Sequence, residues 1–331
     1  MTVTNSSLTD FAPDSTTAPA LADLSPKDKP WDTHKTETVY LFRLLSSASL
    51  DEFSLLSRQV GRLETCSSWL LFRRILDTGT GEIVQKLQNS DFCRVRICPV
   101  CQWRRTLMYQ ARFLSRIDEV LQGKKLAFLF LTLTVRNCPI TELRSTLGTM
   151  REAWKRLTLR REFGIVEGWV RKTEVTRGKD GSAHPHYHCL LVVPPGYFSG
   201  KSYMKTARWV QIWRESLRAD YDPICDVRRV RKVEDIRREV LKYVTKPSDL
   251  ASEASWTAEY VRQVHHLRFI DSGGILKGIF RDERDKSELV HTGEDTPEPT
   301  DQDMGQRMVF GWRQDRYRLT REYRERGENG I

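Results

Sequence analysis

The sequence lacks any apolar run that could cross a membrane. Its apolar stretches are well short of the roughly 20 consecutive residues that a spanning helix needs, so we expect no membrane partner. The first 20 residues have neither a basic segment nor an apolar core, which excludes a secretory signal there. There is also no internal repeat and no glycine-rich P-loop for nucleotide phosphates. Together these absences predict a cytoplasmic protein.

The chain also lacks the cysteine pattern of a disulfide framework. Its 7 cysteines are an odd number that clusters around a single Cys-x-x-Cys, which favours reduced thiols and a metal site. Positive charge, in contrast, is in excess. The 331 residues include 54 Lys and Arg against 44 Asp and Glu, a net charge of +10. This excess indicates a polyanionic partner, although composition alone does not separate nucleic acid from an acidic membrane surface.

Composition divides the chain into five segments. Residues 1–38 are rich in Ser, Thr, Asp, Ala and Pro, and we expect a disordered tail. Residues 39–122 form a Cys-rich N-terminal region, and residues 123–281 form a folded domain with regular periodicity. Residues 282–306 are expected to be an acidic linker, and the apolar and aromatic residues of 307–331 predict a C-terminal segment that returns to the fold.

Periodicity predicts an α+β domain with a central antiparallel sheet. Strands and helices alternate in the order β-α-β-β-α-β-α, which is typical of a ferredoxin-like or split βαβ sheet with helices packed on one face. The predicted strands are 126–135, 165–177, 186–193 and 224–233, and the predicted helices are 143–157, 204–217 and 233–244.

Three histidines lie close together at the start of the third predicted strand and just before it. Because side chains alternate along a strand, His186 and His188 point to the same face, with His184 in line with them. Glu174 of the preceding strand could add a carboxylate, and it competes with His184 for the place of third ligand. Such a donor set with open positions suits Mg²⁺ or Mn²⁺. The alternative is a surface hairpin with partly solvated histidines.

A tyrosine and several charged residues share one face of the last predicted helix. Glu239 and Tyr243 are four residues apart, and Lys246 follows Tyr243 by three. A phenol beside ammonium groups ionises more easily, and the same cations, with Lys242, can neutralise phosphate. The alternative is an ordinary amphipathic helix with a half-buried tyrosine.

Two further clusters are candidates for binding. The cysteine knuckle could hold a structural zinc ion, and its alternative is four reduced thiols without metal. A basic run directly before the tyrosine helix could follow DNA phosphates, although such runs are often merely solvated. The knuckle consists of Cys66, Cys93, Cys98 and Cys101, and the basic run of Arg228, Arg229, Arg231 and Lys232.

In their order along the chain, three of these motifs resemble those of a known family. Phe130–Thr134, His186–His188 and Glu239–Asp249 are similar to the three motifs of rolling-circle plasmid replication initiators, members of the His-hydrophobe-His (HUH) endonuclease superfamily. Glu239 and Tyr243 match the branch with a single tyrosine and a glutamate four residues before it. The resemblance covers about residues 66–244 and implies the same sheet topology, so that residues 123–281 would be the nicking domain.

The resemblance implies a metal-dependent enzyme that nicks and rejoins DNA. Tyr243 would attack a phosphate of single-stranded origin DNA and form a 5′-phosphotyrosine link, freeing a 3′-OH that primes synthesis. A metal on His186 and His188, with Glu174 or His184, would polarise the phosphate, and Lys242 or Lys246 would offset its charge. Glu239 would activate water at termination.

The partners that follow are origin DNA and a host helicase and polymerase. Two alternatives remain open at this level. One is a non-catalytic zinc-containing DNA-binding protein, which leaves the histidines and Tyr243 unexplained. The other is a relaxase or transposase of the same superfamily, which differs in motif order, in having tyrosine pairs or in added helicase domains.

Overall fold

The computed structural model describes residues 6–10, 17–47, 55–121, 123–231, 247–250, 252–280, 289–292, 295–296 and 298–325. The chain divides into two compact units. Unit 1 consists of Met1–Met108 and Glu283–Ile331, and unit 2 of Tyr109–Asp282. Among the described residues, no helix has the length and apolar character that crossing a membrane requires.

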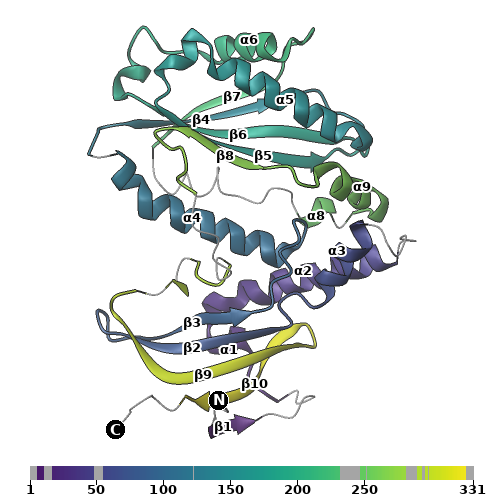
Figure 1. The fold of residues 1–331 in the computed structure, drawn as a ribbon, viewed down its shortest axis with the longest axis vertical. Helices are drawn as coiled ribbons and strands as arrows, with labels where there is room; N and C mark the ends of the chain where they lie inside the picture. Colours follow the sequence, from purple (N-terminus) through teal and green to yellow (C-terminus); the bar gives the residue numbers. More distant parts are fainter. Residues whose placement is uncertain are drawn as a thin grey trace. The chain divides into compact units, whose positions relative to one another are not determined.

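Unit 2 is built on one antiparallel sheet of five strands in the order β7-β4-β6-β5-β8 (Figure 1). Every strand predicted for this region is present, and the α+β class is confirmed. The elements are β4 (Ala127–Thr134), α5 (Leu143–Thr158), β5 (Gly168–Arg177), β6 (Ala183–Val193), α6 (Thr206–Leu217), β7 (Cys225–Val230), α8 (Pro247–Leu250), α9 (Ala254–Val264) and β8 (Ile270–Gly274).

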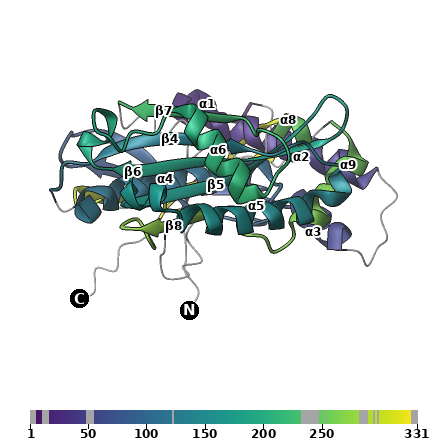
Figure 2. The same cartoon turned by 90° about the horizontal axis from the view of Figure 1, so that it is seen from above.

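Helices cover both faces of this sheet, whereas the sequence predicted helices on one face. Trp154 of α5 and Trp213 of α6 pack around Tyr187, with ring centroids 6.1 and 6.2 Å away, and both helices lie over the strands in Figure 2. The opposite face packs against Phe113 of α4 (Pro99–Leu121), a helix whose residues from Tyr109 onward belong to unit 2. The prediction was wrong because β4 is apolar on both faces, and burying both requires two covering layers.

Unit 1 contains a second five-stranded antiparallel sheet, in the order β1-β10-β9-β2-β3. Strands from both ends of the chain meet in it, since β9 pairs with β2. Its elements are β1 (Ser6–Asp10), α1 (Leu21–Leu24), α2 (Lys29–Ser46), α3 (Leu55–Glu64), β2 (Trp69–Asp77), β3 (Ile83–Ser90), β9 (Asp301–Arg313) and β10 (Arg316–Arg324). The predicted C-terminal segment is therefore part of the same sheet as the Cys-rich region.

The expectation of a disordered tail up to residue 38 is wrong for Ser6–Asp10, which form β1, and from residue 17 onward. Helix α2 begins within that range, with Pro30 in its first turn, where a missing N–H has no cost. Trp31, Thr38 and Leu41 are buried along one side of the helix, and the Trp31 ring lies 6.3 Å from that of Tyr317. The polar residues between them concealed this helical spacing, and long-range packing rather than local composition fixes the segment.

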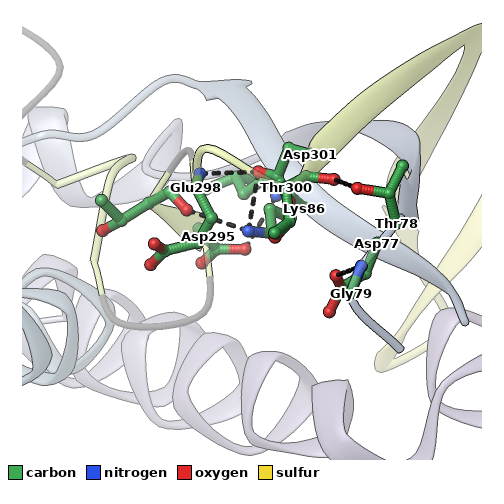
Figure 3. Close-up of polar contacts among 10 residues, drawn as sticks. Asp77, Thr78, Gly79, Lys86, Asp295, Glu298, Thr300 and Asp301 are labelled. Atoms are coloured by element: carbon green, nitrogen blue, oxygen red, sulfur yellow. Dashed lines mark hydrogen bonds and ion pairs between the residues drawn. The ribbon is translucent and has the colours of Figure 1, made fainter. Parts of the chain in front are cut away.

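The expectation of a free acidic linker over residues 282–306 is wrong for its described part, which begins at Leu289, a buried residue whose carbonyl accepts a hydrogen bond from Arg104 at 2.8 Å. Lys86 donates hydrogen bonds to the Thr296 carbonyl at 3.0 Å and to Asp301 at 2.8 Å (Figure 3). Asp295 accepts a hydrogen bond from Arg104, which is 2% exposed, at 2.8 Å. The acidic residues therefore neutralise buried cations inside unit 1.

Candidate active site

The predicted histidine cluster lies on the central sheet of unit 2. His186 and His188 are two residues apart on β6, so they share a face with Leu190, which packs in the core against Phe113 of α4. Glu174 of β5 is the direct register partner of His186. Antiparallel pairing therefore brings one carboxylate against two imidazoles without any contribution from a loop.

The three side chains converge on one point. The Glu174 Oε2 atom lies 2.9 Å from His188 Nε2 and 3.6 Å from His186 Nε2. One ligand atom from each residue lies within 4.8 Å of the others. The glutamate side chain is 10% exposed and His188 20% exposed, so the cluster is nearly buried but open on one side.

The other ring nitrogens are held by the chain. His186 Nδ1 donates to the His184 carbonyl at 3.3 Å, and His188 Nδ1 hydrogen-bonds with Thr132 Oγ1 at 3.3 Å. A carbonyl only accepts, so Nδ1 of His186 carries a proton and its Nε2 is the nitrogen that faces the carboxylate. That Nε2 can hold a proton that it donates to Glu174 or, in place of the proton, a metal ion that Glu174 also binds.

Glu174 stays ionised in this setting. Burial by itself would raise the pKa of its carboxyl, but hydrogen bonds to His186 and His188 and the charge of Lys172 hold that pKa well below its usual range. The site therefore presents a full negative charge near neutral pH, as a ligand for a divalent cation must.

His184 does not join this group. Its Nδ1 donates to Asn137 Oδ1 at 2.5 Å, which fixes the ring away from the carboxylate. Burial and the neighbouring His186 lower the pKa of His184, so the ring tends toward the neutral form. Of the two candidates for third ligand, the structure brings Glu174 to the histidine pair.

Sequence reasoning missed two polar neighbours of the cluster. Lys172 is 2% exposed and pairs in register with His188 from β5, and Thr132 pairs with His188 from β4. The signal for Lys172 was its position two residues before Glu174, which places both on one face of a strand. The sequence contained no comparable signal for Thr132, because its contact depends on which strand lies next to β6.

The predicted nucleophile motif lies outside the described residues. This applies to Glu239, Lys242, Tyr243 and Lys246, and also to Lys232 of the basic run. Their positions in the protein therefore remain predictions from the sequence.

The described part of the basic run divides between the two faces of the sheet. Arg228 pairs in register with Phe130, so it shares the face of His188, and it forms an ion pair with Asp226 at 2.7 Å. Arg229 points to the other face and stacks over the Phe198 ring at 4.5 Å. Arg231 is exposed beyond the end of β7. Of the described part of the run, only Arg228 is shown to share the sheet face of the cluster.

The four predicted cysteines also come together, in unit 1. Cys66 precedes β2, Cys93 follows β3, and Cys98 and Cys101 lie at the start of α4. All four are buried, with Cys98 and Cys101 0% exposed. The other three cysteines, at 138, 189 and 225, are buried in unit 2, where they pack as small core residues.

The sequence is similar to known replication proteins. The model of the family described as "Replication protein" matches residues 84–320. A "Protein rep" of Bacillus amyloliquefaciens is 33% identical over 252 residues, which are 68% of this chain and 73% of that protein. A "Protein rep" of Streptococcus pneumoniae is 31% identical over 303 residues, 86% of this chain and 90% of that protein. No solved structure matches the chain.

Proposed function

We propose, because the chain belongs to the replication-protein family, that it initiates plasmid replication by the rolling-circle mechanism, cutting one DNA strand at the origin. Two features support this proposal. The first is the sheet order β7-β4-β6-β5 with the chain order β-α-β-β-α-β, which agrees with the topology that the HUH resemblance leads us to expect. The second is that one carboxylate and two imidazoles lie together on that sheet, two of them in the segment that resembles the metal motif. The second feature is the single observation that carries the proposal.

Glu174, His186 and His188 fit a divalent cation such as Mg²⁺ or Mn²⁺. The carboxylate is charged, both Nε2 atoms lie close to it, and the His188 side chain is 20% exposed, so a bound cation could also contact a phosphate oxygen or water. When bound there, the cation would supply Lewis-acid polarisation of the scissile phosphate.

The chain's own cations would act on the DNA backbone. Arg228 lies on the same face as His188, and its side chain is 57% exposed, so it could exchange Asp226 for a DNA phosphate. Lys172 is too deeply buried for this role; it supports the charge of Glu174 instead.

The covalent step is assigned to Tyr243. A bond forms between its Oη and phosphorus while the bond from phosphorus to the 3′ oxygen breaks, which leaves a 5′-phosphotyrosine and a 3′-OH. The phenol loses its proton and the departing 3′ oxygen gains one, so the step is balanced. Lys242 and Lys246 would offset charge on the phosphate, and Glu239 would take a proton from water at termination. A host polymerase would then extend the free 3′ end, with a host helicase separating the strands ahead of it.

A nicking assay on supercoiled plasmid carrying the origin tests the proposal. The wild-type protein with Mn²⁺ should convert the plasmid to the open circular form with one mapped 5′ end blocked by protein. Tyr243→Phe should give no conversion, while Tyr203→Phe, at an exposed tyrosine of unit 2, should nick normally. A protein that binds the origin tightly but never cuts it would instead be the non-catalytic DNA-binding alternative.

A further inference from the structure

We propose that Cys66, Cys93, Cys98 and Cys101 hold one structural zinc ion in unit 1, and that the buried Lys35 is its counter-charge. The four ligand positions were expected from the sequence, but the geometry and the role of Lys35 come from the structure. The proposal goes beyond nicking and does not depend on it, since every residue involved lies in unit 1.

The sulfur atoms have the separations of a tetrahedral site. Cys66 Sγ lies 3.5 Å from Cys98 Sγ and 3.7 Å from Cys101 Sγ, and Cys93 Sγ lies 3.7 Å from Cys101 Sγ. Zinc–sulfur bonds of about 2.3 Å at tetrahedral angles imply sulfur–sulfur edges of about 3.8 Å. A disulfide would need roughly 2.05 Å, and all seven cysteines are free.

Backbone N–H groups point at these sulfurs. The amide of Cys93 donates to Cys66 Sγ at 3.4 Å, that of Arg94 to Cys101 Sγ at 3.2 Å, and that of Val95 to Cys93 Sγ at 3.4 Å. N–H donors favour the negatively charged thiolate, which is the form that binds metal. Four thiols that merely filled the core would not need such donors.

Lys35 supplies the charge that such a site lacks. Four thiolates and Zn²⁺ carry a net charge of about −2. The Lys35 side chain, 2% exposed, extends from α2 and donates to the Cys66 carbonyl at 2.5 Å. An ammonium buried there needs an anion nearby, and four thiolates around a zinc ion would supply it.

The site is closed, as a structural ion requires. The least buried ligand, Cys93, is only 8% exposed, so no position is open to a substrate. The ion would join the start of β2, the end of β3 and the start of α4, with α2 packed on the outside through Lys35. Metal binding would then contribute directly to the folding of unit 1.

Elemental analysis of the full-length protein, purified without a histidine tag or chelator, is the first test. We expect about one zinc per chain in the wild type and in Cys225→Ser, a buried cysteine of unit 2, and loss of that zinc in Cys98→Ser. A folded wild-type protein without metal, or with iron in place of zinc, would overturn the proposal.

Lys35→Met tests the counter-charge without touching a ligand. When cobalt replaces zinc, the wild type and Lys35→Met should both show the visible absorption of a tetrahedral thiolate site. This spectrum tests for the site without the Cys98→Ser variant, so the test holds even if that variant does not fold. Zinc affinity, measured by competition with a chelating dye, should fall about 10- to 100-fold in Lys35→Met. Unchanged affinity would remove Lys35 from the proposal, and no cobalt spectrum in the wild type would refute the site.

Discussion

The two side-chain clusters of the protein differ in donor chemistry and in access. The cluster in unit 1 has four sulfur donors and is buried on all sides, whereas the cluster in unit 2 combines two imidazoles with a carboxylate and is open on one side. Soft thiolates in a closed cage suit an ion that only stabilises structure. Harder donors with an open side suit an ion that must also meet a substrate. Under the two proposals above, the structural ion and the catalytic ion would be held by separate units of the chain.

Charge is divided between the units in the same way. Unit 2 contains 32 of the 54 Lys and Arg residues and 20 of the 44 Asp and Glu residues, which leaves 22 and 24 for unit 1. The positive excess of the protein is therefore located entirely in the unit with the candidate active site. In unit 1, cations such as Lys86 and Arg104 are paired internally with acids. Attraction of a DNA backbone is expected from unit 2.

The largest expected effect is the response to a chelator. Brief treatment with EDTA should abolish nicking, because the open Glu174 site exchanges its ion quickly, while the zinc of the closed cysteine site stays bound. Added Mn²⁺ should restore full activity. Nicking rates and zinc content, measured on the same samples, check the loss of activity and the retention of zinc. If zinc and activity were lost together, the proposed difference in ion exchange between the two sites would be wrong.

The next effect concerns the third ligand. Glu174→Gln should lower the nicking rate by about 100-fold or more, because an amide is a poor ligand for Mg²⁺ or Mn²⁺ and the charge is lost. His184→Gln is the matched control and should lower the rate less than about tenfold, since His184 is bonded to Asn137 instead. Nicking rates of both variants are measured at saturating Mn²⁺. A larger loss of rate in His184→Gln than in Glu174→Gln would make His184 the third metal ligand instead of Glu174.

Much of unit 2 could be predicted from the sequence because its signals are local. The strand predicted at 126–135 is β4, and the helix predicted at 143–157 is α5. Period-two alternation also put His186 and His188 on one face, and Glu174 was a candidate ligand because it lies on the other strand of a short hairpin. His184 was not separable from Glu174 in this way, because the Asn137 side chain that holds it belongs to a different segment.

Unit 1 was much harder to predict because its contacts are distant in sequence. The sheet pairs β2 with β9, more than 200 residues later, and no local pattern specifies such a pairing. Helix α2 was read as disordered because its apolar positions are separated by polar ones. The cysteines were an exception, since residue type alone brought Cys66 together with Cys93, Cys98 and Cys101 as candidates.

A smaller effect tests the difference in charge. Arg228→Gln should reduce the slope of log affinity against log salt for a single-stranded origin oligonucleotide by about 0.7, the share of one phosphate contact. Arg316→Gln in unit 1, where the arginine is paired with Asp23, should leave the slope unchanged. Fluorescence anisotropy at a series of salt concentrations measures both, and equal slopes for wild type and Arg228→Gln would exclude the contact.

The smallest effect concerns Tyr187, which lies between the two histidines but faces the opposite side of the sheet. Burial raises its pKa to about 12. Its contribution to stability is therefore complete below the unfolded pKa of about 10 and is lost as the pH rises toward 12. Nicking by Tyr187→Phe at neutral pH should be unchanged. Between pH 8 and pH 11, the free energy of unfolding of Tyr187→Phe should rise by about 1 kcal/mol relative to that of the wild type. Urea unfolding at both pH values, with Tyr203→Phe as the exposed control, checks this; a constant difference would contradict it.

The covalent adduct tests the central claim most directly, namely that the Glu174–His186–His188 cluster serves tyrosyl transfer to DNA. A 5′-labelled and a 3′-labelled origin oligonucleotide would each be incubated with wild type, His186→Ala or Tyr243→Phe, with and without Mn²⁺, and run on a denaturing gel. We predict a protein-linked band with the 3′-labelled strand in the wild type with Mn²⁺, and none with either variant or without the metal. An adduct that persists in His186→Ala, or in the wild type without metal, would contradict the claim.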